Sequence, residues 1–150
     1  MTETNSKRNP QSLAAGYVRY ARSLRFDHDP DAVWSPETDP DCAAFQIVDR
    51  TVRNGPAPQA WELIVEVLRQ TPDEELGFEG SGRLEDFVRA HGAAMIEQIE
   101  REAERDERFR WALGFVWLFV GDLPSDVLAR VVQASGGVIK PLDRSERRAR

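Results

Sequence analysis

The sequence predicts an all-α protein of six to seven short helices joined as αα-hairpins. Apolar residues recur at three- and four-residue spacing through most of the chain. Helix-start signals such as Asn9-Pro10 and Asp39-Pro40 precede several of these stretches. No segment of useful length alternates between apolar and polar residues as a half-buried strand would. The short connections leave open a compact bundle or an irregular α-solenoid.

The N-terminal half is predicted to hold three helices. The first spans about 10–25, and residues 26–38, with two prolines and four acids, indicate a loop after it. The second starts at Asp39 and ends at the Asn-Gly-Pro sequence 54–56. The third spans about 58–70, and its wide apolar stripe indicates contact with more than one neighbouring helix.

The C-terminal half is predicted to continue in the same way. We expect a short helix within 72–77 and one from about 82 to His91 that ends at Gly92. Further helices are expected over 93–105, 107–120 and 124–134. Residues 111–120, WALGFVWLFV, are too few to cross a bilayer, which takes about 20. We interpret them as part of a buried helix, which places Trp111 and Trp117 in the core together with Trp61.

Length and composition predict one soluble domain. We expect a disordered N-terminus over 1–8, a single helical domain over 9–137, and a basic C-terminal tail over 138–150. The single cysteine, Cys42, rules out an internal disulfide, and the N-terminus has no apolar signal region, so we expect a cytoplasmic protein without a membrane segment.

The charge distribution argues against binding to nucleic acid. The net charge is −6, and between Phe26 and Asp49 there are seven acids and no Lys or Arg. Nucleic-acid binding requires a basic footprint, and the short arginine-rich tail is more typical of a solubilising end.

The stretch GSGRLEDFVRAHG, residues 80–92, is the segment that most resembles a motif. Glu85 stands where a dinucleotide-binding loop would need its third glycine, and no Lys-Ser or Lys-Thr pair follows as in a P-loop. A carboxylate at a helix start would also repel phosphate. We therefore interpret the segment as the beginning and end of one helix.

His91, Glu85 and Asp86 are the candidate catalytic residues. At 100° per residue, His91 falls on the apolar side of the helix, whereas Glu85 and Asp86 point away from it. Glu85 instead aligns with Arg89 at i,i+4, the favourable order for an ion pair. His91 is placed to satisfy open carbonyls at the helix end. A structural role is the better interpretation of all three residues, and no complete catalytic set is found.

The segment DHDPD, residues 27–31, places Asp27, Asp29 and Asp31 as in a calcium loop, but the glycine and glutamate of an EF-hand are missing. We therefore expect no metal and no cofactor, and interpret the segment as a solvated acidic loop. Trp34 lies in the same loop and either fastens it to the body or contacts a partner.

Several stretches follow one another in a specific order: AWELIVEVLRQTPDEELG, then GSGRLEDFVRAHG, then IEQIEREAERDERFRWALGFVW. The chain from about Gln59 to Leu118 therefore resembles a bacterial domain family of unknown function with the pattern W-E-L-I, G-x-G-P-L-E-D-L, H-G and R-F-R-x-A-L-x-x-V-W. Arg83 stands where the family commonly has proline. The resemblance implies a bacterial cytoplasmic helical domain and carries no activity.

These observations favour a small acidic protein-binding module, of the kind that bacterial regulatory and immunity proteins represent. Its expected partner is a basic protein, contacted through Trp34, Asp27, Asp29 and Asp31. The alternative is a hydrolase in which His91 works with a carboxylate from another helix. A homo-oligomer is a further possibility, because the predicted helix 107–120 is apolar nearly all round.

Overall fold

Side-chain caps start the N-terminal helices of the computed structural model, which describes residues 9–27 and 35–145. α1 (Pro10–Phe26) begins after Asn9, whose side chain accepts a hydrogen bond from the backbone N–H of Gln11. α2 (Pro40–Asn54) begins after Asp39, which caps its first turn in the same way. α3 (Ala57–Gln70) follows after a short connection. The predicted starts at Asn9-Pro10 and Asp39-Pro40 are confirmed.

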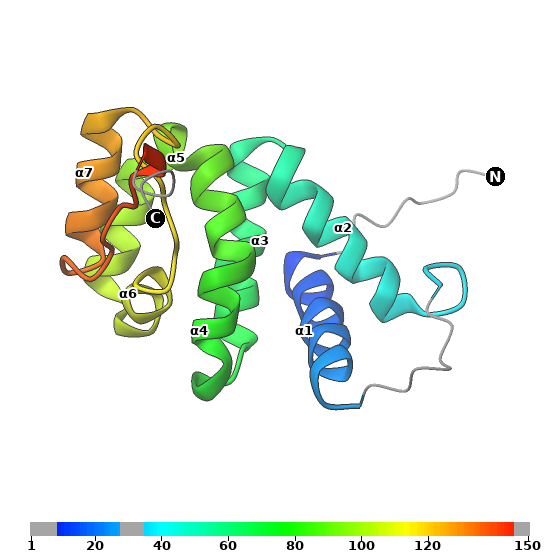
Figure 1. The fold of residues 1–150 in the computed structure, drawn as a ribbon. Helices are drawn as coiled ribbons and strands as arrows, with labels where there is room; N and C mark the ends of the chain where they lie inside the picture. The colour runs from blue at the N-terminus through cyan, green and yellow to red at the C-terminus, as the bar shows by residue number, and fades with distance from the viewer. Residues whose placement is uncertain (1–8, 28–34, 146–150) are drawn as a thin grey trace.

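The middle of the chain forms an irregular helical stretch with one kink. A 3-10 turn (Asp73–Glu75) leads into α4 (Leu76–Glu79), a π-helical segment (Gly80–Leu84) and α5 (Glu85–Arg105), and the backbone of Met95 is not helical, so the chain turns there (Figure 1). The predicted break between two helices is therefore present, but it falls at Met95 instead of Gly92. Gly92 is buried, and an added Cβ would lie 3.3 Å from the Leu123 side chain, so this glycine permits close packing just before the kink.

The helix predicted over 107–120 is also too long, because α6 ends early (Glu107–Leu113). Gly114 and Phe115 form a turn, the chain is not helical between Val116 and the last helix, and Phe119 forms an isolated parallel bridge with Leu142. Val116 and Leu118 are buried while Trp117 between them is exposed, the alternation of an extended segment. A run without polar residues carries no periodicity that could distinguish this conformation from a helix.

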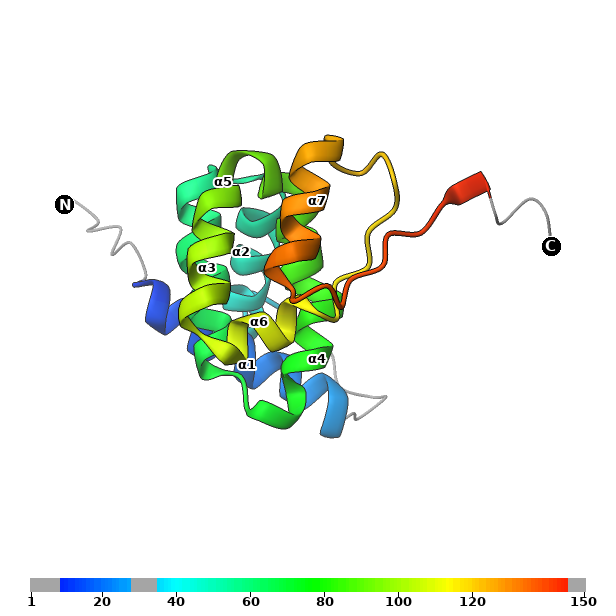
Figure 2. The ribbon, with the colours of Figure 1, turned by 90° about the vertical axis from the view of Figure 1, so that its left-hand side faces the viewer.

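α7 (Ser125–Ala134) completes the fold, and the chain segments before and after it leave on the same side of the helix (Figure 2). Residues 138–142, expected at the start of a basic tail, pack against this part of the protein. Ile139 belongs to the core, and Leu142 exchanges backbone hydrogen bonds with Leu118 and Val120.

The elements follow one another along the molecule, from α1 and α2 at one end to α6 and α7 at the other (Figure 1). α1 packs on α2 and α3, and α5 contacts α2, α3, α6 and α7. One hydrophobic core runs through all of them, from Leu13 to Ile139. The all-α prediction is confirmed, and the arrangement is a compact fold with a shared core. Within the described residues, no helix has the length and apolar character needed to cross a membrane.

The tryptophans are not all in this core. Trp61 is partly buried and packs against Phe87 and Phe109 at ring-centroid distances of 5.6 and 5.7 Å. Trp111 and Trp117 are 60% and 61% exposed, so their predicted core placement is wrong. Both lie in the segment that was expected to be a buried helix over 107–120.

Two glycines of the π-helical segment should respond differently to the same substitution. A Cβ at Gly80 would lie 2.1 Å from the carbonyl oxygen of Ala112, whereas a Cβ at Gly82 would meet nothing within 4 Å. We expect Gly80→Ala to lower the free energy of unfolding by about 1–3 kcal/mol, the usual range for overpacking. Gly82→Ala should leave it unchanged or raise it by up to about 1 kcal/mol, because alanine favours helix. Urea denaturation of both variants tests this, and equal stabilities would contradict the close approach of Gly80 to α6.

Substitutions of two neighbouring residues after α6 should also differ in their effect on the free energy of unfolding. Leu118 is fully buried, and Leu118→Ala should cost about 2–5 kcal/mol of unfolding free energy. Trp117→Ala should change it by less than about 0.5 kcal/mol, because the side chain is exposed. Thermal and urea denaturation measure both values. A large loss for Trp117→Ala would mean that the indole packs inside the protein.

Candidate functional site

A cleft of about 570 Å³ lies where α1, α2 and the π-helical segment meet. α1 contributes Tyr17 and Arg25, α2 contributes Phe45, and the π-helical segment contributes Gly82 and Arg83. The volume is in the range of small-molecule sites. The segment singled out in the sequence, GSGRLEDF, therefore forms one wall of a real depression.

Tyr17 and Glu79 form a buried hydrogen-bonded pair in this cleft. The Tyr17 hydroxyl donates to Glu79 Oε2 at 2.9 Å, and Glu79 is only 4% exposed. Burial raises the pKa of the Glu79 carboxyl, although the Tyr17 hydrogen bond and the charge of Arg25 oppose this shift. Burial is also the main cause that raises the pKa of the Tyr17 hydroxyl, and the charge of Glu79 raises it further. The pair therefore holds its protons more tightly than either group would in water.

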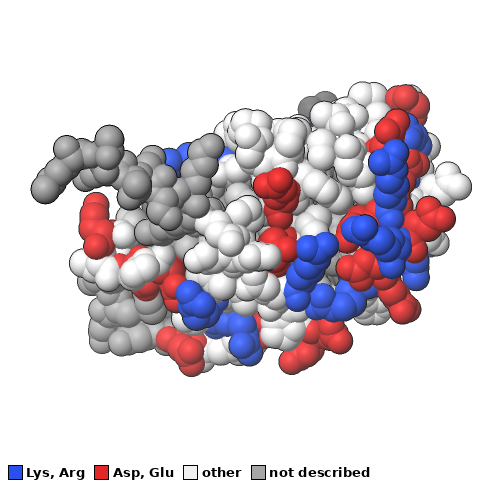
Figure 3. Space-filling view, turned by 180° about the vertical axis from the view of Figure 1, so that it is seen from behind, with Lys and Arg blue, Asp and Glu red and all other residues white. Residues whose placement is uncertain are grey.

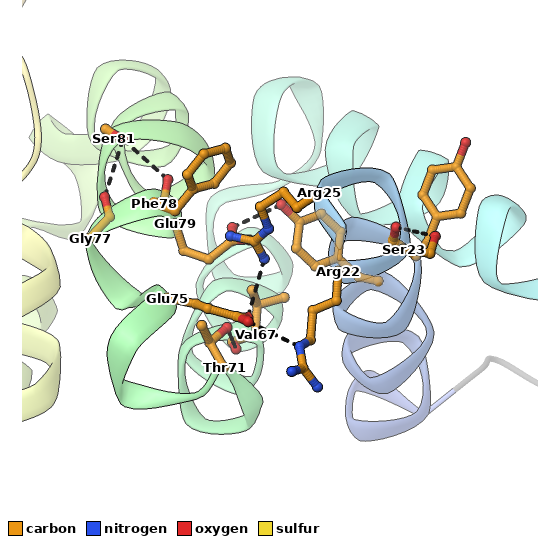
Figure 4. Close-up of polar contacts among 12 residues, drawn as sticks. Arg22, Ser23, Arg25, Val67, Thr71, Glu75, Gly77, Phe78, Glu79 and Ser81 are labelled. Atoms are coloured by element: carbon orange, nitrogen blue, oxygen red, sulfur yellow. Dashed lines mark hydrogen bonds and ion pairs between the residues drawn. The ribbon is translucent and has the colours of Figure 1, made fainter. Parts of the chain in front are cut away.

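A second buried acid, Glu75, lies one turn before Glu79 and faces the same arginine. Arg25 Nη2 lies 3.4 Å from Glu75 Oε2 and 3.8 Å from Glu79 Oε1, so its guanidinium group bridges the two carboxylates (Figure 4). Arg22 Nε donates to the other oxygen of Glu75 at 3.1 Å. These contacts join the end of α1 to α4.

Arg83 anchors the opposite wall of the cleft. Its Nη1 lies 2.6 Å from Asp49 and 2.7 Å from Asp86, and Arg53 also contacts Asp86 at 3.2 Å. The Arg83 guanidinium group lies over the ring of Phe45 at 5.3 Å. The π-helical segment is therefore tied to α2 by charge and by aromatic contact.

Two donors of this network have no partner within residues 9–27 and 35–145. Arg25 Nε and Arg83 Nε are both buried and make no hydrogen bond there. The carboxylates around them are occupied, since Glu75, Glu79, Asp49 and Asp86 each have an arginine or tyrosine contact. The network thus has hydrogen-bond donors in excess, an uncommon state for buried polar atoms.

The π-helical segment gives the cleft its shape because close packing holds one side of it. An added Cβ at Gly77 would lie 2.9 Å from the Phe115 ring, and Gly80 lies against the backbone of Ala112. Ser81 donates back to the carbonyl oxygen of Gly77 or Phe78. Single π-helical turns are rare and recur at functional sites. In this protein the segment faces α6 on one side and the cleft on the other.

A second feature is an aromatic surface at the α6 end, formed by Trp111, Phe115, Trp117, Val138 and Leu142. Trp111 and Phe115 contact each other edge to face at 5.4 Å, and with Val138 they line a groove of about 270 Å³. Val138 also lines a groove of about 210 Å³ together with Trp117 and Leu142. Val138 therefore joins the two groups into one apolar surface.

The Glu85–Arg89 pair holds the backbone of this surface. The two side chains lie 2.8 Å apart, which confirms the predicted i,i+4 pair. The Trp117 N–H donates to Glu85 Oε2 at 3.0 Å, and Arg89 Nη2 donates to the Trp117 carbonyl oxygen at 2.9 Å. Glu85, considered in the sequence as a catalytic acid, thus positions the extended segment that carries Trp117.

His91 makes a contact with a different helix from the one expected. Its Nε2 lies 2.9 Å from the carbonyl oxygen of Val52, in the last turn of α2, and its ring packs on Phe87 at 5.4 Å. A carbonyl oxygen can only accept, so Nε2 carries the proton in this contact. His91 therefore caps α2 and not its own helix. The carboxylate that a hydrolase would need is not among the contacts found for His91 within the described residues.

The other candidate residues are dispersed. Asp86 belongs to the Arg83 and Arg53 network, and Asp27 follows the end of α1, where its N–H donates to the Ser23 carbonyl. Asp29, Asp31 and Trp34 lie outside the described residues. Among the described residues, no three His, Cys, Asp or Glu side chains are grouped so that they could hold a metal ion.

Several acids of the chain serve internal contacts. Asp39 caps α2, Asp41 pairs with Arg19 at 2.9 Å, and Asp49 pairs with Arg53 at 2.8 Å. On the face seen in Figure 3, positive and negative side chains lie side by side instead of forming separate fields. The net charge of −6 is therefore not concentrated on this face.

Glu75, Glu79, Arg22 and Arg25 were missed in the sequence. Glu75 and Glu79 are four residues apart, and Arg22 and Arg25 are three apart, so each pair shares one helix face. The signal in the sequence was the position of two acids on one helix face, next to the apolar Leu76. It predicts an ion-pair network only when the acid pair and the arginine pair are considered together.

Replacing Glu79 should change how stability depends on pH. The pKa of Glu79 is raised in the folded state above its ordinary value of 4.5, so ionisation of this carboxyl disfavours folding. The unfolding free energy of the wild type minus that of Glu79→Gln should be constant below pH 4.5 and should fall as the pH rises from there through the raised pKa of Glu79. Urea denaturation over a pH series measures this, with the exposed Glu97→Gln as control. A difference that rises with pH would contradict the burial of Glu79.

Comparison with known proteins gives one match. A family described as a family of unknown function, DUF6869, matches residues 32–138. Neither a curated protein nor a solved structure matches the chain. The match extends on both sides of the range 59–118 that carried the resemblance in the sequence. It covers more than half of the chain, and the protein therefore belongs to this family of unknown function.

Proposed function

We propose that this protein is a protein-binding module that contacts its partner through the aromatic surface. One observation carries the proposal: large apolar side chains lie together and exposed on a protein whose core is otherwise well covered. Isolated exposed apolar residues are ordinary, but a joined patch with grooves is typical of interaction sites. Tryptophan and phenylalanine are also among the residues enriched at protein interfaces.

The construction of the surface supports this proposal. The Glu85–Arg89 pair holds the Trp117 backbone from both sides, and the Trp111 ring contacts the Phe115 ring edge to face. A Cβ at Gly114 would lie only 3.3 Å from Val138, so the two chain segments meet closely here. A surface that is already ordered loses less conformational entropy on binding. The grooves beside Val138 can receive apolar side chains of a partner.

The expected partner is a basic protein, as in regulatory or immunity-type pairs. The net charge of −6 would attract such a partner at long range, and salt would weaken this attraction. Because Asp41 and Asp49 are paired internally, we assign the charge a role in steering and the aromatic surface the contact itself. Additional contacts with the partner remain a prediction for four residues of the acidic loop: Asp27, Asp29, Asp31 and Trp34. The hydrolase alternative has no support from the surroundings of His91.

Removing the aromatic surface should abolish partner binding without unfolding the protein. We would place a photo-crosslinking residue at Val138 in the source cell and compare the wild type with the double variant Trp111→Ser and Trp117→Ser. The double variant should lose the crosslinked partner at unchanged melting temperature. Phe26→Ser, which removes an exposed ring elsewhere, should keep it. A partner retained by the double variant would contradict the proposal.

Light scattering of the purified protein separates a foreign partner from a second copy. A dimer that the double variant converts to a monomer would assign the aromatic surface to self-association. A monomeric wild type that yields no crosslink from Val138 would remove the proposal altogether.

A further inference from the structure

We infer that the cleft between α1, α2 and the π-helical segment binds a small organic anion. Its anionic group would lie at the guanidinium groups of Arg25 and Arg83. Its apolar body would lie against the rings of Phe45 and Phe78. This site is separate from the aromatic surface and does not depend on the proposed protein partner.

The first support is the balance of hydrogen-bond donors and acceptors. A carboxylate only accepts and a guanidinium group only donates. Both oxygens of Glu75 and Glu79 have contacts, yet the Nε atoms of Arg25 and Arg83 are buried without a partner among the described residues. A ligand that completes this network has to supply acceptor atoms. An oxyanion does so at the terminal nitrogens, and it reaches the buried Nε atoms only when neighbouring side chains such as Phe78 move.

The second support is the net charge of the lining. Arg25, Arg53 and Arg83 face the cleft against two carboxylates, Glu79 and Asp86. Behind them, Asp49 and Glu75 contact Arg83 and Arg25, and Arg22 balances Glu75 from α1. The side chains that face the cleft thus include one more guanidinium group than carboxylates, and Arg22, Glu75 and Asp49 behind them make the whole cluster neutral. The attraction for an anion comes from the guanidinium groups that face the cleft.

The third support is the apolar part of the walls. Phe45, Leu24 and Ala21 line the cleft beside the arginines, and Phe78 stands at its rim. An inorganic anion would leave these side chains facing water. A ligand with an aromatic or aliphatic body covers them, and the cleft of about 570 Å³ has room for one.

Phe78 controls access to the Arg25 guanidinium group. Its ring lies 4.4 Å from the Arg25 Cζ atom and is 63% exposed. Exposed side chains change rotamer on the picosecond-to-nanosecond scale, so this ring can move without repacking the core. Gly82 keeps the neighbouring part of the cleft open, since a Cβ there would meet nothing within 4 Å.

Four probes test this inference by NMR titration of the full-length protein. Benzoate and phenyl phosphate carry both an anion and a ring, benzyl alcohol carries only the ring, and acetate carries only the anion. We expect benzoate or phenyl phosphate to shift the amide signals of Ser81, Gly82 and Arg83 in a saturable way. Benzyl alcohol and acetate should each bind at least about tenfold more weakly, a difference of about 1.4 kcal/mol. The stronger of the two ring-bearing anions identifies the oxyanion that the cleft prefers.

Two variants keep the test decisive if one of them folds poorly. Gly82→Phe would fill the cleft from a position with free space and should weaken binding of the preferred probe at least about tenfold. Ala93→Phe, on the exposed face of α5, is the matched control and should bind as the wild type does. Arg83→Lys keeps the positive charge but loses the Nε donor, and it should also weaken binding.

Four results would overturn the inference. The first is equal affinity for benzoate and benzyl alcohol, which would show that charge plays no part. The second is signal changes confined to the aromatic surface around Trp111 and Trp117. The third is binding only at probe concentrations near the solubility limit, and the fourth is unchanged binding by Gly82→Phe. Either of the last two marks an adventitious ligand.

Discussion

The burial of Glu75 and Glu79 against the end of α1 is the contact on which the rest of the arrangement depends. These carboxylates lie one turn apart and are 6% and 4% exposed, so they can remain there only with partners. Arg22, Arg25 and Tyr17, all from α1, supply those partners. Removing one member of such a buried set typically costs about 3–5 kcal/mol. α1 is therefore attached to the centre of the molecule by specific polar contacts as well as by apolar packing.

The cleft and the aromatic surface share one structural element. The chain from Gly77 to Gly82 presents Gly82 and Ser81 to the cleft, and its glycines at 77 and 80 face Phe115 and Ala112 of the α6 region. Phe115 belongs to the aromatic surface. Any displacement of this chain segment at the cleft would press directly on the packing beneath Phe115. The two sites thus lie on different sides of the same chain segment.

The sequence predicted the parts of the fold that local rules decide. The helix starts at Asn9 and Asp39, the Glu85–Arg89 pair and the all-α class followed from capping and periodicity. The helix break predicted at Gly92 lies at Met95, and the prediction failed for residues 114–120, where contacts with Leu142 decide the conformation. A glycine can end a helix or let a neighbour approach, and an apolar run fits helix or extended chain. Local pattern alone does not separate these outcomes.

The candidate site could be predicted only in part for the same reason. The stretch 80–92 was recognised as unusual, but the roles of its residues lie in contacts between distant segments. Glu85 holds Trp117, His91 holds the Val52 carbonyl, and Arg83 holds Asp49. The aromatic surface was missed because residues 111–120 were predicted to be part of a buried helix, which placed Trp111 and Trp117 in the core. Burial of a tryptophan depends on where its chain segment turns.

The π-helical segment also determines which of its own residues face each neighbour. Each residue of an α-helix turns the chain by about 100°, whereas a π-turn accommodates an additional residue within one wider turn. Deleting one residue within 80–84 would therefore restore a regular α-helix and shift the residues inside the segment around the axis, so Gly80 against Ala112 and Arg83 against Asp49 could not both keep their places. The additional residue and the glycine at position 80 are both properties that a descendant sequence has to preserve.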